Sequence, residues 1–174
     1  MRRTYGDEGN RYVVLTVQVH MIEKLEADAL IVGFHEDIRP LKGGAGVLDW
    51  LLCGALSRLI IQKKITGAVG DVALLTSKGK VPADKIFMIG LGPKAELSAA
   101  SLRSALRTAA ASAAGAGVAH AALDCFPQGS MPDDDALAAI RQGLAEGAGT
   151  HPIDFALLAP DAAAVARLSR LIHA

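Results

Sequence analysis

Residues 85–94 read KIFMIGLGPK, and they decide the fold because an apolar run here ends in two glycines, Gly90 and Gly92, and Pro93. The run has the composition of a buried strand, and Ser98 then opens an Ala- and Leu-rich segment that we expect to be a helix. A strand, a glycine turn and a helix form the crossover unit of α/β proteins, whose ligands tend to lie beyond the carboxyl ends of the strands. We therefore predict an α/β fold.

Other apolar runs predict the remaining elements. We expect further strands at 12–19, 28–34, 70–76, 118–125 and 153–159, and helices at 47–63, 98–114, 136–146 and 161–172. The second half of the chain alternates strands and helices as parallel sheets do, whereas turn-like links join the strands of the first half. Together these elements predict three layers, α/β/α, around a mixed, mostly parallel sheet of about six strands.

Length and composition favour one globular domain. The chain has 174 residues, of which 51% are hydrophobic and 21% are charged, which suits a packed core rather than a disordered chain. We expect residues 1–11 to be a flexible lead and residues 12–174 to form a single domain. Cys53 and Cys125 lie in apolar surroundings, so we expect both thiols to be buried and reduced.

Charge and hydropathy argue against two classes of partner. The formal net charge is +0, whereas a nucleic-acid surface needs clustered Lys and Arg. The strongest apolar stretch, residues 47–61, is interrupted by Asp49 and Arg58 and is too short to span a bilayer. The basic start of the chain is not followed by the apolar segment of a signal peptide. We expect a cytoplasmic protein that binds neither membranes nor nucleic acid.

Two glycine clusters are candidate ligand-binding sites. Gly90 and Gly92 would bring backbone N–H groups to a phosphate, although the third glycine of a dinucleotide fingerprint is absent and Pro93 has no N–H. The cluster Gly43, Gly44, Ala45 and Gly46 directly precedes a predicted helix, where anions commonly bind. Each cluster also has a structural interpretation: a tight turn for the first, and a glycine-assisted helix start for the second.

The sequence contains no recognisable catalytic or metal-binding pattern. None of its five histidines belongs to an HExxH motif or pairs with a cysteine at zinc spacing, and no Gly-x-Ser-x-Gly elbow is present. We expect the aspartates 133–135 to cap a helix that begins at Ala136. His120 and Cys125 are five residues apart on one strand and so face opposite sides. We predict no catalytic residue, no metal and no cofactor.

Several segments resemble the N-terminal domain of the leucyl aminopeptidases, the M17 peptidase family. Residues 27–34, ADALIVGF, resemble an early strand of that domain. Residues 70–106, GDVALLTSKGKVPADKIFMIGLGPKAELSAASLRSAL, resemble its most characteristic stretch, with Leu102 and Arg103 as the Leu-Arg pair of the helix. Residues 145–147 and 153–172 resemble a later helix end and the final strand and helix, so the resemblance covers residues 17–173.

This resemblance implies a macro-domain-like fold and a part in assembling the hexamer of that family. The catalytic half of the family, which carries two metal ions, has no counterpart among the segments of this chain. The resemblance therefore implies a non-catalytic domain that associates with copies of itself or with an aminopeptidase-type catalytic partner.

A second resemblance is to the macro domains that bind ADP-ribose. It rests on residues 26–37, EADALIVGFHED, followed by residues 43–52, GGAGVLDWLL. Here residues 33–36, GFHE, stand where macro domains carry an Asn-rich turn. This resemblance implies an alternative function, the binding of ADP-ribose or a related nucleotide through the loop at Gly43–Gly46. A third alternative is one part of a split metal-dependent aminopeptidase.

Overall fold

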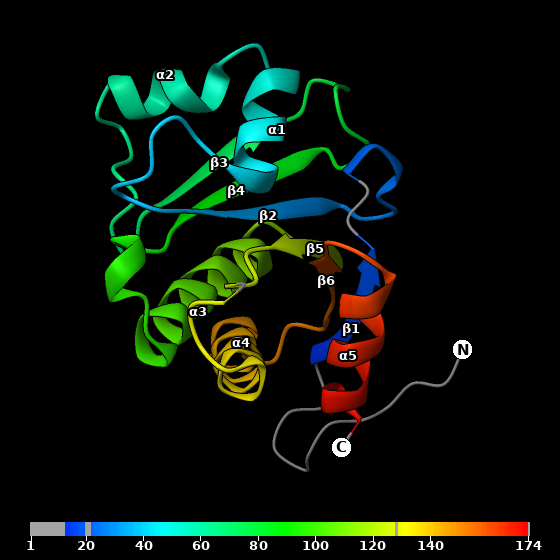
Figure 1. Ribbon diagram of the computed structural model, residues 1–174. Helices are drawn as coiled ribbons and strands as arrows, with labels where there is room; N and C mark the ends of the chain where they lie inside the picture. Colours follow the sequence, from blue (N-terminus) through cyan, green and yellow to red (C-terminus); the bar gives the residue numbers. More distant parts are fainter. Residues whose placement is uncertain (1–12, 20–21, 128, 174) are drawn as a thin grey trace.

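The fold is built on one twisted sheet (Figure 1), seen in a computed structural model that describes residues 13–19, 22–127 and 129–173. The six strands lie in the order β1-β6-β5-β2-β4-β3. Neighbouring strands are parallel except for β3 and β4, which are antiparallel. The mixed, mostly parallel sheet that the sequence predicts is therefore confirmed. The strands are β1 (Val13–Val19), β2 (Ala29–Phe34), β3 (Val72–Thr76), β4 (Lys85–Gly90), β5 (His120–Asp124) and β6 (Ile153–Ala159).

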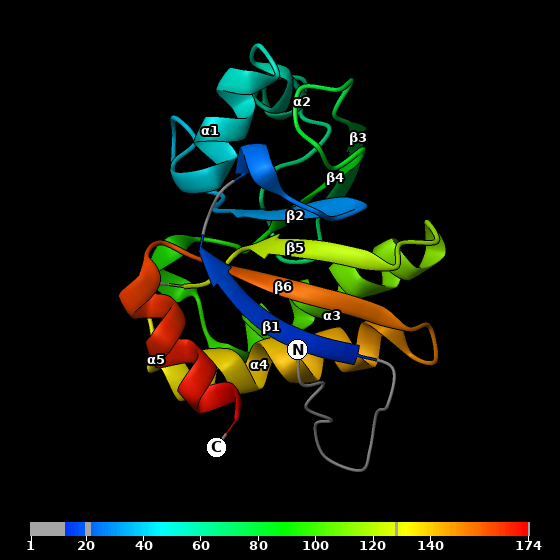
Figure 2. The same ribbon diagram turned by 90° about the vertical axis from the view of Figure 1, so that its right-hand side faces the viewer.

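Helices cover both faces of the sheet, which gives three layers (Figures 1 and 2). On one face lie α1 (Gly43–Leu51) and α2 (Ala55–Ile61), and on the other lie α3 (Ala99–Gly115), α4 (Asp133–Ala148) and α5 (Ala162–Ile172). Two short 3₁₀ segments, η1 (Ile22–Lys24) and η2 (Lys94–Glu96), complete the described elements. The predicted α/β/α architecture is confirmed.

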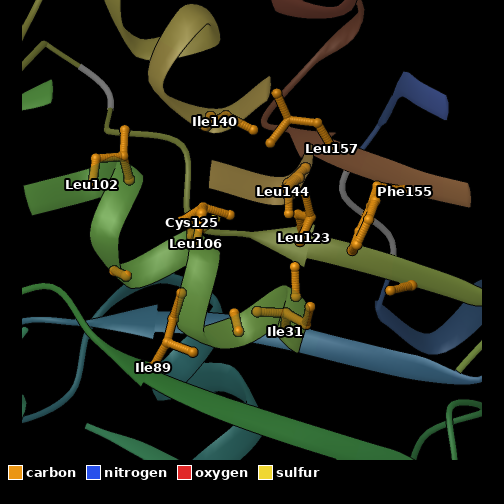
Figure 3. Packing of buried hydrophobic residues seen from close by; sticks show 14 of the residues in the cluster. Ile31, Ile89, Leu102, Leu106, Leu123, Cys125, Ile140, Leu144, Phe155 and Leu157 are labelled. Carbon is orange, nitrogen blue, oxygen red and sulfur yellow. The ribbon is translucent and has the colours of Figure 1, made fainter. Parts of the chain in front are cut away.

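The central strands are apolar on both faces because both faces are covered by helices. In β2, Ile31 packs into the core beneath α3 and α4, whereas its neighbours Leu30 and Val32 pack into the core beneath α1 and α2. Figure 3 shows the first of these cores, where side chains from four strands meet Leu106 of α3 and Ile140 of α4. Two-sided burial explains why the strands appear in the sequence as unbroken apolar runs.

α3 and α4 pack closely through small residues. A Cβ atom placed on Gly147 would overlap the carbonyl oxygen of Arg107 and would lie 2.8 Å from the Cβ atom of Ala110. A Cβ atom placed on Gly143, one helical turn earlier, would lie 2.5 Å from the carbonyl oxygen of Arg103. The backbones of the two helices therefore approach so closely that only glycine fits at these two positions of α4.

Side-chain caps begin two of the helices as the sequence predicts. The Ser98 hydroxyl accepts a hydrogen bond from the Ser101 N–H, and the Ser101 hydroxyl accepts one from the Ser98 N–H, so the two serines form a capping box for α3. The Asp161 carboxylate accepts a hydrogen bond of 2.8 Å from the Ala164 N–H and caps α5.

The single helix predicted at 47–63 is wrong. The segment forms α1 and α2, which meet at an angle of 106°. The chain turns at Cys53 and Gly54, where φ is 53° and 77°, in the left-handed region that ends helices. The apolar pattern continues across the break because both helices face the same core.

The helix predicted to begin at Ala136 begins three residues earlier, at Asp133. The three aspartates therefore occupy the first turn of α4 instead of preceding it, and Pro132 takes the N-cap position without a side-chain cap. Negative charge in the first turn still stabilises the helix, because it interacts favourably with the positive end of the helix dipole. The predicted lead at residues 1–11 lies outside the described residues. Within the described ranges no single helix is long and apolar enough to cross a bilayer, and α1 and α2 meet that criterion only when counted as one bent pair.

Candidate functional site

The turn at Gly90–Gly92 lies at the carboxyl end of β4, where the sequence predicts it. Its three N–H groups all donate to carbonyl oxygens of the protein: Gly90 to Asp71 at 2.9 Å, Leu91 to Phe34 at 3.0 Å, and Gly92 to Gly67 at 2.8 Å. A phosphate would have to compete with each of these hydrogen bonds. The geometry of Gly90 and Gly92 matches the structural interpretation, a tight turn held against two neighbouring segments.

Glycine is required in this turn by close packing. A Cβ atom on Gly90 would overlap the carbonyl oxygen of Ala68, and the φ of Gly92 is 74°, which L side chains rarely adopt. The segment that packs against the turn is itself held by the Asp71 carboxylate, which accepts hydrogen bonds from the N–H groups of Thr66 at 2.6 Å and Gly67 at 3.0 Å. Burial alone would raise the pKa of Asp71, but these hydrogen bonds bring it below its ordinary value.

The loop after β2 is joined to the loop after β4. The Gly92 carbonyl oxygen accepts a hydrogen bond of 3.1 Å from the Glu36 N–H and lies 3.1 Å from Nδ1 of His35, and the Asp37 carboxylate accepts one of 2.9 Å from the Lys94 N–H. A shallow hollow of about 460 Å³ lies beside these contacts. It is lined by Asp37, Ile38, Lys94, Ala95, Leu97 and Ser130.

The second glycine cluster forms the first turn of α1. Lys42 is the N-cap residue, with an extended backbone and no side-chain cap. The N–H of Gly46 donates to the Lys42 carbonyl oxygen at 3.2 Å, and within the part of the chain that the structure describes no acceptor is found for the N–H groups of Gly43, Gly44 and Ala45. This helix start is the part of the predicted site whose donors remain open.

Of the residues in the two glycine clusters, Gly46 is the one that lines either of the two hollows among the described residues. Gly46 lines a hollow of about 520 Å³ together with Pro40, Leu41, Asp49, Trp50, Cys53 and Gly54. No residue of this hollow also lines the hollow at the end of β4. The structure therefore does not bring Gly43, Gly44, Ala45 and Gly46 into one pocket with Gly90 and Gly92.

Asp49, the acidic residue of the larger hollow, caps the neighbouring helix. Its carboxylate accepts hydrogen bonds from the N–H groups of Leu56 at 2.9 Å and Ser57 at 3.0 Å, and from the Ser57 hydroxyl at 2.5 Å. The sharp turn between α1 and α2 places this side chain of α1 over the N-terminus of α2. The carboxylate thus replaces the local cap that α2 lacks, since its own N-cap residue is Gly54.

The expectation that both thiols are buried is wrong for one of them. Cys125 is buried, and burial raises the pKa of its thiol. Cys53 is exposed, because the turn between α1 and α2 directs it away from the core. His120 is exposed on the strand that precedes Cys125, so these two side chains do not meet.

Other titratable side chains are dispersed over the molecule. Among the described residues no group of three or more His, Cys, Asp or Glu side chains is arranged to hold a metal ion. The ring nitrogens of His120 lie 3.6 Å from a carboxylate oxygen of Asp28 and 3.8 Å from one of Asp154. His120 begins β5, so this group lies at the amino ends of the strands, away from the turn at Gly90–Gly92. His151 contacts the Val118 carbonyl oxygen at 3.2 Å.

Large exposed apolar side chains gather in one part of the chain. Of the six found among the described residues, five lie between residues 47 and 74, a range that holds α2 and parts of α1 and β3. Trp50 and Ile61 are 79% and 78% exposed, and Leu74 of β3 is 55% exposed. We did not predict these positions from the sequence. The signal that reveals Trp50 is its place opposite Leu48 and Leu52 on the helix, whereas nothing local distinguishes Leu74 from a core residue.

Residues 31–149 match the N-terminal domain of the cytosol aminopeptidase family. A probable cytosol aminopeptidase of Geobacter sulfurreducens is 33% identical over 136 residues, which are 78% of this chain and 27% of that protein. A second one, from Geobacter sp., is 40% identical over 77 residues, 44% of this chain and 15% of that protein. The chain thus spans about a quarter or less of the length of these relatives.

Solved structures share the fold. A variant of tomato leucine aminopeptidase superposes with a TM-score of 0.71 and 18% identity, covering 97% of this chain and 37% of that one. A Trypanosoma brucei macrodomain in complex with ADP-ribose has a TM-score of 0.68 and 18% identity, covering 93% of this chain and 69% of that one. A variant of an Oceanobacillus iheyensis macrodomain has a TM-score of 0.71 and 14% identity, covering 92% of this chain and 90% of that one.

Proposed function

Since this chain belongs to the cytosol aminopeptidase family, whose N-terminal domain it matches, we propose that it is a non-catalytic domain that associates with a second copy of itself. The observation that supports self-association is the exposure of Trp50 and Ile61, large apolar side chains of α1 and α2, the two helices on one face of the sheet. Aromatic side chains are enriched at protein interfaces.

Trp50 is the largest of these side chains. It is 79% exposed at the rim of the 520 Å³ hollow, and it is the single tryptophan of the chain. Tryptophan is enriched among the residues that contribute most to binding, and full burial of a large apolar side chain is worth about 1.5–3 kcal/mol. An interface that covers part of the region between residues 47 and 74 would therefore gain appreciable free energy.

The polar groups around the carboxyl end of β4 support a structural rather than a chemical role for this part of the molecule. The backbone donors of the turn at Gly90–Gly92 bond within the protein, and so does the carboxylate of Asp71. A catalytic acid or base has to reach a substrate atom. These groups instead hold loops together.

Light scattering coupled to gel filtration tests self-association directly. We expect a mass that is a multiple of 18.0 kDa at high micromolar concentration and that falls toward 18.0 kDa on dilution. The emission of Trp50 reports whether the interface covers α1: a shift to shorter wavelength on concentration would place the tryptophan inside it. A mass of one chain at every concentration would contradict self-association.

The other partner considered for this domain is an aminopeptidase-type catalytic chain. The Geobacter sulfurreducens relative extends far beyond the matched region, so its remainder is a defined probe. Gel filtration of this chain mixed with that remainder distinguishes the two partners. Co-elution of the mixture, together with a monomeric mass for this chain alone, would favour the catalytic partner over a second copy.

Nucleotide binding is a second candidate function, and the open first turn of α1 favours it. The N–H groups of Gly43, Gly44 and Ala45 have no acceptor among the described residues, and helix N-termini attract phosphates. Calorimetric titration with ADP-ribose tests this function. We expect heat from the native chain and none from Gly44→Asp, whose carboxylate would repel a phosphate; absence of heat from the native chain at millimolar ligand would exclude this function.

A further inference from the structure

Positive charge is concentrated on α1, α2 and the loop that leads to them. In Figure 1 these two helices lie together on one side of the sheet. The one acidic residue between positions 38 and 64 is Asp49, whereas the cations of this range are Arg39, Lys42, Arg58, Lys63 and Lys64. Because the formal net charge of the whole chain is +0, the excess of positive charge is a local property of this segment.

Two of these charged side chains are already engaged within the protein. The Asp49 carboxylate accepts hydrogen bonds from the N–H groups of Leu56 and Ser57 and from the Ser57 hydroxyl. The Arg39 guanidinium donates to two carbonyl oxygens of the loop after β2, both at 2.7 Å, and to that of Thr66 at 3.0 Å. Among the described residues of this segment, the exposed cations that keep donors to spare are Lys42, Arg58, Lys63 and Lys64.

The hollow of about 520 Å³ lies on this segment and suits an apolar side chain. Apart from Asp49, its lining consists of Pro40, Leu41, Trp50, Cys53 and two glycines. Trp50 is 79% exposed at the rim, so a group that entered the hollow would gain contact with the indole. A hollow of this size, with a mostly apolar lining and few polar groups, is typical of sites that hold a small ligand or an anchoring side chain.

Arg58 borders this hollow. Its Nη1 donates to the Cys53 carbonyl oxygen at 2.8 Å and lies 3.7 Å from a Cβ atom placed on Gly54, and both of these residues line the hollow. A guanidinium binds a carboxylate through two parallel hydrogen bonds, and the other N–H groups of Arg58 have no acceptor among the described residues. Lys42 is exposed and directly follows the lining residue Leu41, so a second cation lies near the same hollow.

We propose that this hollow binds an acidic, apolar peptide segment of a partner protein, with an aliphatic side chain beside Trp50 and a carboxylate on Arg58. Charge complementarity identifies the occupant: the cations around the hollow favour an anion, and the one carboxylate nearby, that of Asp49, is compensated by the N–H groups of α2. The concave shape favours an inserted side chain over the flat surface of a bilayer. The inference goes beyond self-association, because its occupant does not have to be a second copy.

Calorimetric titration with a short synthetic peptide of Glu and Leu, capped at both ends, tests the site. The control peptide has Gln in place of each Glu, so it keeps the apolar side chains and loses the charge. We expect the Glu–Leu peptide to bind the native chain and the Gln–Leu peptide to bind at least about fivefold more weakly. Trp50 is the single tryptophan of the chain, so a change in its emission during the titration shows that the peptide lies at the hollow.

Substitution of Arg58 assigns the effect to one cation. We expect Arg58→Gln to weaken binding of the Glu–Leu peptide by about fivefold to tenfold, and Arg58→Lys, which keeps the charge, to recover part of the loss. Arg141→Gln is the matched control, because Arg141 is an exposed arginine of α4, which covers the other face of the sheet. Circular dichroism checks that each variant is folded.

A second measurement needs no substitution. Iodide and caesium ions both quench tryptophan emission, and the positive charge around Trp50 should attract the anion and repel the cation. Relative to free N-acetyltryptophanamide, we expect quenching of the native chain to favour iodide over caesium, and addition of the Glu–Leu peptide to remove this preference. A preference for caesium would contradict a positive surface at the hollow.

The outcomes separate this inference from the proposed function. Equal binding of the two peptides, or an equal loss of binding in Arg58→Gln and Arg141→Gln, overturns the inference. Binding of the chain to phosphatidylserine vesicles without binding of the Glu–Leu peptide also overturns it and assigns the surface to a membrane. If light scattering shows a dimer that does not bind the peptide, self-association stands and this inference is wrong. If a chain that is monomeric at every concentration binds the peptide at Trp50, this inference stands and self-association is wrong.

Discussion

Individual hydrogen-bond donors and acceptors at the two ends of the sheet hold neighbouring segments in place. At the amino end, the Asp28 carboxylate, at the start of β2, accepts hydrogen bonds from the N–H groups of Ala119 at 3.0 Å and His120 at 2.9 Å, at the start of β5. At the carboxyl end, the carbonyl oxygens of Phe34 and Gly67 hold the turn after β4. Each contact joins segments that are distant in the sequence.

The contacts of Asp28 predict acid sensitivity. The backbone hydrogen bond from His120 is the largest cause that lowers the pKa of Asp28 below its ordinary value of 3.8, and partial burial acts in the opposite direction. Because the pKa is lower in the folded chain than in the unfolded chain, the carboxylate stabilises the fold above pH 3.8, and this stabilisation is lost as the pH falls through the folded-state value.

We expect Asp28→Asn to be less stable than the native chain at about pH 7, and the difference to be smaller at about pH 2, because the carboxyl loses its charge as the pH falls through its lowered folded-state pKa. Urea unfolding at the two pH values measures the difference. The carboxylate is about half exposed, so its contribution is small compared with that of a buried ion pair. An equal difference at both pH values would show that the carboxylate charge is not responsible.

Close helix packing is the main feature at the scale of the elements. The backbones of α3 and α4 touch at Gly143 and Gly147. Alanine is therefore excluded from these two positions of α4, although its helix propensity alone would favour it there. We expect Gly147→Ala to lower the free energy of unfolding by about 1–3 kcal/mol, because the added methyl group overpacks the helix pair.

Gly115→Ala is the matched control for that substitution. Gly115 ends α3, is exposed, and has no atom within 4 Å of a Cβ atom placed on it. We expect this variant to be unchanged or more stable by up to about 1 kcal/mol, as helix propensity predicts. Urea unfolding of both variants checks the pair, and equal effects would mean that packing between α3 and α4 is not the cause.

The strands were predictable from the sequence, whereas one helix break was not. Strands buried on both faces leave continuous apolar runs: β6 spans residues 153–159 as predicted, and β4 begins at Lys85, where the quoted apolar run begins. The break between α1 and α2 leaves no gap in the apolar pattern. It depends on Asp49 reaching the N–H groups of Leu56 and Ser57, a contact that exists only once the chain has turned.

The candidate site was predictable only in part for the same reason. Gly90 and Gly92 lie at the carboxyl end of β4, as the local pattern indicates, whereas Gly43, Gly44, Ala45 and Gly46 form the first turn of α1 instead of preceding it. The N–H groups of Gly90 and Gly92 donate to the carbonyl oxygens of Asp71 and Gly67, which precede β3. These contacts between distant segments have no local signal in the sequence. The position of β3 at the border of the sheet, which exposes Leu74, follows from strand order, and a single sequence does not encode that order in any local signal.

For the molecule as a whole, similarity in fold outlasts similarity in sequence. The tomato leucine aminopeptidase variant and the Oceanobacillus iheyensis macrodomain share the architecture at 18% and 14% identity. A layered pattern of burial is sufficient to specify such a fold, since many apolar residues fill the same core positions. Function then depends on which surfaces each domain leaves exposed.

Self-association predicts that thermal stability depends on protein concentration. If folding and pairing are coupled, a tenfold higher concentration stabilises the folded dimer by up to about 1.4 kcal/mol, and the midpoint of thermal unfolding rises. Calorimetry over a range of concentrations measures the effect. A midpoint that stays constant over the range of concentrations would argue against coupled pairing.

The unequal burial of the two thiols has a practical consequence. Cys53 is exposed and Cys125 is buried, and they are the two cysteines of the chain. A maleimide reagent should therefore attach a spin label or a dye at one sulfur of the native sequence, without any substitution. In an assembly of two such chains, the separation of the two labels measured by electron paramagnetic resonance would give the geometry of the pair as a distance.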